Sequence, residues 1–102
     1  MARFDVFVNP NKAARHLLYV DVQSDFARLS TRWCIPLLLH VPVRPVIQGA
    51  QALIAVDQQD YILDTPNLLA VPASLLRQRA GRLSSGDQLI AESCMDFMLR
   101  GY

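Results

Sequence analysis

The sequence predicts a single mainly β domain over residues 1–102, an antiparallel sheet followed by one C-terminal α-helix. Three observations support this prediction. Apolar and polar residues alternate with a period of two in several short runs, as they do in half-buried strands. The last segment instead carries apolar residues at helical spacing behind an N-terminal capping pattern. The chain has no internal repeat, low-complexity tract or linker, and its length suits one domain.

The first half of the chain predicts three strands. Residues 4–8 and 18–22 alternate in polarity on either side of a polar loop, so we expect a β-hairpin. Residues 23–30 break the pattern with polar side chains that can bond their own backbone in a turn. The strand pattern resumes over residues 31–39. Because proline cannot donate to a strand ladder, Pro36 predicts an edge, a bulge or a sharp bend in this strand.

The second half predicts a further hairpin and a short helical turn. Residues 53–56 and 61–63 are apolar runs joined by the polar residues 57–60. Prolines interrupt the stretch that follows, and we expect a break in regular structure there. Residues 74–79 could form a short helical turn that ends at Gly81.

The final segment predicts a helix over residues 86–99. Ser85 and Gln88 have the spacing of a capping box, and Asp87 is well placed for the helix dipole. The residues predicted to face the sheet are Ile90, Cys94 and Phe97. A neighbouring apolar stripe contains Met95, Leu99 and Tyr102.

Composition limits the partners that the protein can have. The chain is 52% hydrophobic and 19% charged, which implies a large core or a surface that becomes buried on self-association, so we expect a homodimer. A net charge of +1 gives no strong field to attract nucleic acid or an anionic membrane. The longest apolar runs are too short to cross a bilayer. Since the N-terminus lacks the apolar stretch of a signal peptide, we expect a cytoplasmic protein.

The sequence contains no convincing catalytic or metal-binding constellation, and we expect the protein not to be an enzyme. The candidate groups for nucleophilic catalysis are Cys34, His16, His40, Asp21 and Asp25, and nothing in their spacing fixes a mutual geometry. We expect the histidines to be strand-end residues and the aspartates to make structural hydrogen bonds. The two cysteines belong to no C-x-x-C pair or His/Cys cluster, so we expect buried thiols, no metal and no cofactor.

A group of three arginines is the best local candidate for contact with phosphate or an acidic peptide. The group consists of Arg77, Arg79 and Arg82. The simpler alternative is a solvated turn whose charges bind no partner.

Four segments along the chain carry a family resemblance. They are Leu18-Tyr19-Val20-Asp21-Val22-Gln23-Ser24-Asp25, then Ile35-Pro36-Leu37, then Val71-Pro72-Ala73-Ser74, then a terminal helix that ends in Gly101-Tyr102. In this order and over nearly its whole length, the chain resembles the CcdB family of toxins from toxin-antitoxin modules. The first segment is the most specific, because β-structure in general does not demand such a polar run after a strand.

The resemblance implies an SH3-like barrel and a homodimer with the terminal helices near its two-fold axis. It also implies a target, the A subunit of DNA gyrase, which the family holds in its cleaved-DNA state without covalent chemistry by the toxin. A CcdA-like antitoxin with a disordered tail would neutralise the protein, and DNA contact, as in transcription regulation, would be indirect through that complex. One alternative is an endoribonuclease, because another toxin family shares the barrel.

The resemblance also carries over a set of partner-facing positions. They are Phe26 and Ala27 after the turn, and Asp96, Leu99, Arg100, Gly101 and Tyr102 on the terminal helix and tail. For the antitoxin, the arginine group Arg77, Arg79 and Arg82 is a possible contact.

Two of these positions depart from the family pattern. Ala27 stands where well-studied members have a large apolar residue, and Arg100 stands where they have a tryptophan thought to stack on an arginine of gyrase. Losing that stacking would forfeit a cation–π contact of about 0.5–2 kcal/mol. Three outcomes are open: the host gyrase differs at the partner position, Tyr102 takes over the stacking, or the chain is a non-toxic relic that only binds antitoxin.

Overall fold

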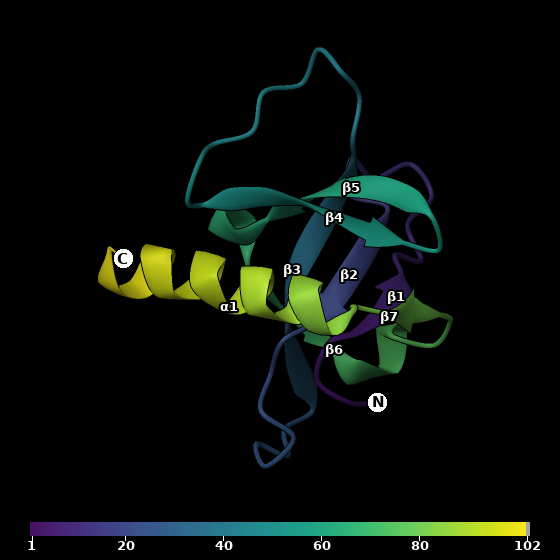
Figure 1. Ribbon diagram of the computed structural model, residues 1–102. Coiled ribbons are helices and arrows are strands. Elements are labelled where there is room, and N and C mark those ends of the chain that lie inside the picture. Colours follow the sequence, from purple (N-terminus) through teal and green to yellow (C-terminus); the bar gives the residue numbers. More distant parts are fainter. Residues whose placement is uncertain (102) are drawn as a thin grey trace.

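The computed structural model describes residues 1–101, whose strands form one curled antiparallel sheet with a helix lying across it (Figure 1). The elements are β1 (Asp5–Val8), β2 (Leu18–Asp21), β3 (Thr31–Leu39), β4 (Gln51–Val56), β5 (Gln59–Asp64), the short 3-10 helix η1 (Thr65–Asn67), β6 (Leu69–Pro72), a second one, η2 (Ala73–Leu75), β7 (Arg79–Arg82) and α1 (Ser85–Arg100). The strand order is β4-β5-β3-β2-β1-β7, with β6 also paired to β3. The end strands β4 and β7 lie near each other without pairing by hydrogen bonds, so the sheet is curled into a half-barrel. The predicted mainly β, barrel-like class is confirmed.

Strands β1, β2 and β3 form the antiparallel arrangement that the alternating sequence predicts. The register pairs Val6 with Val20 and Val20 with Ile35, and all three side chains are fully buried. Burial of one such side chain stabilises the fold by about 1.5–3 kcal/mol. The same core cluster includes Ala91 and Cys94 of α1, so it joins the sheet to the helix.

Pro36 lies in the central strand β3 and not in an outer strand of the sheet. On one side its partner is Tyr19 of β2. On the other side, β6 pairs with β3 as far as Cys34, and β5 pairs with it only from Leu37 onward. Pro36 therefore lies in the gap between two neighbouring strands, where its missing N–H costs no ladder bond. The predicted strand edge therefore exists only locally at Pro36, between the ends of β5 and β6.

The hairpin β4–β5 is confirmed, with a tighter turn than predicted. Its two central residues, Asp57 and Gln58, have φ values of +50° and +65°. Positive φ at both central residues is typical of the two-residue turn that matches the twist of the paired strands.

Two strands escape prediction from local pattern. The prolines that suggest a break lie before β6 and at its end. They do not prevent β6 from pairing with β3. The predicted helical turn over residues 74–79 is wrong in extent, because only Ala73–Leu75 is helical and Arg79–Arg82 is a strand paired with β1. In both cases a strand distant in sequence supplies the pairing, which local propensity does not encode.

Helix α1 begins one residue before the predicted start, and its cap differs from the predicted one. The N-cap is Ser84 and not Ser85: its Oγ accepts the N–H of Asp87 at 3.1 Å. At the other end Gly101 has φ of +85° and donates its N–H to the carbonyl of Phe97 at 2.8 Å. No helix in the described part of the chain is long and apolar enough to span a membrane.

The helix packs on the body of the protein along a narrow strip. Its buried residues are Ala91 and Cys94, whereas Ile90 and Phe97, also predicted to face the sheet, are 36% and 40% exposed. Phe97 lies over Gly49, where a Cβ atom would come within 2.9 Å of the ring. The C-terminal turns of α1 extend past the sheet, as Figure 1 shows. Their side chains are therefore available to a partner.

Candidate functional site

The turn between β2 and β3 is held in one conformation by its own polar side chains. Gln23 is buried; its Oε1 accepts the N–H of Trp33 at 2.9 Å, and its amide donates to the carbonyl of Ala27. Ser24 Oγ accepts the N–H of Phe26 at 3.2 Å. The polar run after β2 thus fixes the path of the turn, as expected for side chains that bond nearby backbone.

A buried ion pair lies beneath this turn. Arg32 donates from Nε to Asp21 Oδ2 at 2.8 Å and from Nη2 to Asp25 Oδ1 at 3.3 Å. Asp21 is completely buried; burial raises the pKa of its carboxyl, and the bonds from Arg32 and the Gln23 N–H oppose that rise. The predicted structural role of the two aspartates is confirmed. Arg32 anchors the turn, because it joins β3 to both ends of the polar run.

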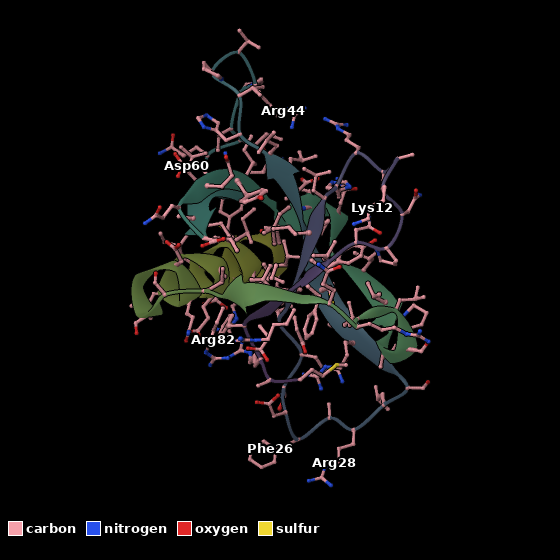
Figure 2. All side chains as sticks on the ribbon, turned by 90° about the vertical axis from the view of Figure 1, so that its right-hand side faces the viewer. Lys12, Phe26, Arg28, Arg44, Asp60 and Arg82 are labelled. Carbon is pink, nitrogen blue, oxygen red and sulfur yellow. The ribbon has the colours of Figure 1, made fainter. Side chains whose placement is uncertain are left out.

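Phe26 is held outside the protein by this fixed turn. Its side chain is 96% exposed, and Figure 2 shows the ring pointing away from the body of the molecule. Leu29, later in the turn, is 63% exposed. Large apolar side chains held in solvent by a hydrogen-bonded turn are typical of a surface that becomes buried on binding.

The end of α1 presents the other predicted site residues. Leu99 is 82% exposed, and Asp96, Arg100 and Gly101 are also exposed. Leu99 and Asp96 border a hollow of about 280 Å³ at the side of the helix. Tyr102, also predicted to contact the partner, lies outside the described residues.

Trp33 joins the turn to the helix end. It is 55% exposed and lines a hollow of about 260 Å³ with Met98 and Leu99, as well as one of about 280 Å³ with Ala27 and Leu29. Trp33 is not among the site residues that the sequence predicts, because an apolar residue in a strand usually belongs to the core. Its only signal is that it is the one tryptophan of the chain. We call the combined area the Trp33 surface, made of Phe26, Ala27, Leu29, Trp33, Met98 and Leu99.

The groups considered for catalysis have other neighbours. Burial raises the pKa of the Cys34 thiol to about 12 and also raises that of Cys94, so neither is an activated nucleophile. Cys34 packs in a small apolar cluster with Phe7, Val71 and Leu76. Within residues 1–101 no group of three His, Cys, Asp or Glu side chains is arranged to hold a metal ion.

His16 and Asp64 form a contact whose surroundings are structural. His16 Nε2 lies 2.8 Å from Asp64 Oδ2, and the side-chain amides of Gln51 and Asn67 each donate to Asp64 at 2.8 Å. Burial alone would raise the pKa of Asp64, but these bonds outweigh it and lower the pKa below its usual value. The carboxylate joins the β1–β2 loop, β4 and η1 at one point.

Replacing Asp64 with Asn is expected to destabilise the protein by about 2–3 kcal/mol at neutral pH, because the charge-assisted bonds are lost. The folded pKa of Asp64 is depressed, so its contribution is present above the ordinary carboxyl pKa of 3.8 and is lost as the pH falls through the lower folded value. Urea unfolding at pH 7 and near pH 3 should show that the gap in free energy of unfolding between wild type and Asp64→Asn is smaller at the lower pH. The exposed Asp60 provides the control, and Asp60→Asn should change stability by less than about 0.5 kcal/mol. A gap that stays constant with pH would contradict the assigned role.

The three arginines predicted as a basic patch have different surroundings. Arg79 and Arg82 both donate to Asp5 Oδ1, at 3.3 and 3.2 Å. Arg77 instead donates from Nε to the carbonyl of Ser74 at 2.9 Å. Two of the three charges are thus partly neutralised by a carboxylate of β1.

Comparison with known proteins identifies the family of the chain. No curated protein matches it. The family model described as CcdB protein matches residues 3–101 of the 102-residue chain, which includes every described element. On this match, the chain belongs to the CcdB family, the toxins of toxin-antitoxin modules.

Proposed function

We propose that this protein is a type II toxin that binds the A subunit of DNA gyrase and stabilises the complex in which the DNA is cleaved. The observation that carries the proposal is the Trp33 surface, where a rigid turn and the end of a helix present large apolar side chains to solvent. An inhibitor that acts by occupying a cavity of its partner needs such a preformed surface and no activated nucleophile. Binding of this kind stabilises whichever state of the partner has the cavity open.

The proposal is tested by DNA cleavage with gyrase from the host. Purified protein should increase the amount of linear, protein-linked DNA in a dose-dependent manner. RNA incubated with the protein alone should stay intact, and cleavage there would favour the alternative endoribonuclease function. Absence of cleaved DNA with the correct host gyrase would overturn the proposal.

We also propose that the protein acts as a cytoplasmic homodimer. The outer strand β6 supports this, because it pairs on one side only and its Leu69 is 37% exposed. Burial of β6 in a dimer interface would leave the Trp33 surface free for a partner. Sedimentation equilibrium should give twice the mass of one chain, and a monomer at micromolar concentrations would contradict the dimer.

Neutralisation by a CcdA-like antitoxin completes the proposal. A disordered antitoxin segment that folds on the toxin would cover the Trp33 surface and block access of gyrase. The arginines 77, 79 and 82 remain possible contacts for an acidic part of that segment. Contact of the pair with DNA would be through the antitoxin.

Replacing Arg100 with Trp is expected to strengthen gyrase poisoning by up to about 30-fold when the gyrase has an arginine at the facing position, since a cation–π contact adds about 0.5–2 kcal/mol. Arg100 is exposed in the last turn of α1, so the cost to the helix is limited to its dipole interaction, about 0.3–1 kcal/mol. The measurement is the protein concentration that gives half-maximal DNA cleavage.

The variant Arg100→Ala separates gain of an aromatic ring from loss of a charge, because it removes the cation alone. Consider the case in which the wild-type protein does not poison gyrase. If Arg100→Trp and Arg100→Ala are then equally inactive, the missing tryptophan is not the cause of the inactivity. That result would favour the alternative in which the chain is a non-toxic relic that only binds antitoxin.

A further inference from the structure

The hollow between Trp33 and the end of α1 is lined by two of the three methionines of the chain. Met95 and Met98 border it together with Trp33 and Leu99. The two methionines lie three residues apart on α1, so they are neighbours on the helix surface. The third, Met1, lines neither of the hollows at Trp33. The Trp33 surface thus contains thioether sulfur, which peroxides oxidise.

The two methionines of the helix differ in exposure. Met98 is 46% exposed and lies in the last turns of α1, which extend past the sheet (Figure 1). Met95 is partly buried and packs against the core cluster of the sheet and helix. Because the sulfur must meet the oxidant directly, Met98 should react before Met95.

The two cysteines do not compete for the oxidant. Cys34 and Cys94 are both buried, and burial raises the pKa of both thiols, that of Cys34 to about 12. A cysteine reacts with peroxide as the thiolate, which the raised pKa disfavours at neutral pH. A thioether reacts without losing a proton. In α1, Met98 is therefore the sulfur that a peroxide can reach and oxidise in the folded protein.

We propose that Met98 is a site of reversible oxidation by hydrogen peroxide, and that its sulfoxide weakens binding at the Trp33 surface. A lone pair of the sulfur attacks one peroxide oxygen and the O–O bond breaks. The sulfur loses two electrons and gains that oxygen, and the other oxygen leaves as water. A methionine sulfoxide reductase reverses the change: two thiols are oxidised to a disulfide, and the sulfoxide oxygen leaves as water.

The sulfoxide changes the surface that a partner must cover. A polar oxygen replaces part of an apolar side chain in a hollow whose other walls include Pro66, Leu68 and Leu99. Burying such an oxygen without a hydrogen-bond donor is unfavourable, so affinity for an apolar partner surface should fall by about tenfold or more. This consequence rests on the proposed function, whereas the oxidation of Met98 itself does not.

The first test uses the intact protein without a partner. After brief treatment with hydrogen peroxide, mass spectrometry of peptides should find the added oxygen at Met98 to a greater extent than at Met95. Trp33 is the only tryptophan of the chain, so tryptophan fluorescence reports on this surface alone. Its emission should shift in wild type and return after treatment with methionine sulfoxide reductase. In Met98→Leu, which keeps Met1 and Met95, peroxide should leave the emission unchanged.

The second test measures affinity for the gyrase A subunit after the peroxide has been removed. Each protein is compared with its own untreated form. Wild type and the control Met95→Leu should each lose about tenfold or more, and the reductase should restore both. Met98→Leu should change by less than about twofold on treatment, because it has no sulfur at this position. Urea unfolding of the treated proteins shows that loss of binding is not loss of folding.

Several results would overturn the proposal. Oxidation of Met95 as fast as that of Met98, or an unchanged Trp33 emission in oxidised wild type, would exclude the modification site. An equal loss of gyrase affinity in treated wild type and treated Met98→Leu would show that another residue is responsible. Absence of gyrase binding by untreated wild type would instead contradict the proposed function, and the first test would still decide whether Met98 is the site of oxidation.

Discussion

Replacing Arg32 with Met is expected to destabilise the protein by about 3–5 kcal/mol, since removal of one partner of a buried ion pair leaves the other charge uncompensated. Asp21 is completely buried and Arg32 is 7% exposed, so water cannot replace the lost bond. The turn that carries Phe26 should also loosen, because Arg32 bonds Asp25 and the carbonyl of Gln23 as well. Urea denaturation measures the first effect, and hydrogen exchange of the amides in residues 23–30 measures the second.

Two controls make this prediction specific. Arg79→Met removes an exposed arginine that also pairs with an aspartate, and it should cost less than about 1 kcal/mol. The double variant Asp21→Asn with Arg32→Met should recover part of the stability, because no unpaired buried charge remains. Equal losses in Arg32→Met and Arg79→Met would show that the burial of the pair is not what matters.

Replacing Leu99 with Asp is expected to weaken binding of the gyrase A subunit by about 30-fold or more while leaving the fold intact. A central apolar contact residue typically contributes 2 kcal/mol or more to an interface, and a buried unpaired carboxylate adds a further cost. The side chain is 82% exposed in the protein alone, so its replacement has little effect on the stability of the monomer. Binding to immobilised gyrase A subunit, measured by surface plasmon resonance, gives the loss directly.

Leu89 is the matched control for this experiment. It is also a leucine of α1 and is 65% exposed, but it lies near the start of the helix and lines none of the hollows around Trp33. Leu89→Asp should bind gyrase within about twofold of wild type, since substitutions of exposed residues away from an interface have small effects. Sedimentation of both variants separates loss of gyrase binding from loss of the proposed dimer. A similar loss in both leucine variants would exclude the end of α1 as the specific contact.

The elements that sequence reasoning predicted correctly have a local signal. The strand over residues 31–39 is a long apolar run that follows a polar turn, and the terminal helix has helical spacing bounded by Ser84 and Gly101. The strands β6 and β7 have four residues each and contain proline or glycine, so their local propensity is low. They exist because β3 and β1 supply hydrogen-bonding partners distant in the sequence.

The candidate site was predictable only in part for a related reason. A polar run after a strand predicts a turn, and the family resemblance places Phe26 and Leu99 near a partner. Trp33 connects Phe26 and Leu99 only because β3 and α1 meet in space. The sequence alone does not show this, since Phe26 and Leu99 lie far apart along the chain. The three arginines are close in sequence, yet two of them bond Asp5 and the third bonds the carbonyl of Ser74.

The amino-acid sequence by itself determined the class of fold, the turn and the helix, because each depends on residue order over short segments. It also determined the family, through a match over residues 3–101. Tertiary structure alone decided which charges are neutralised and which apolar side chains stay in solvent. The residue type does not distinguish Arg32 from Arg79, but Arg32 is buried against Asp21, whereas Arg79 is exposed beside Asp5. Whether a charge or a hydrocarbon group is desolvated depends on the atoms that surround it, and in this sheet most of those atoms come from distant parts of the chain.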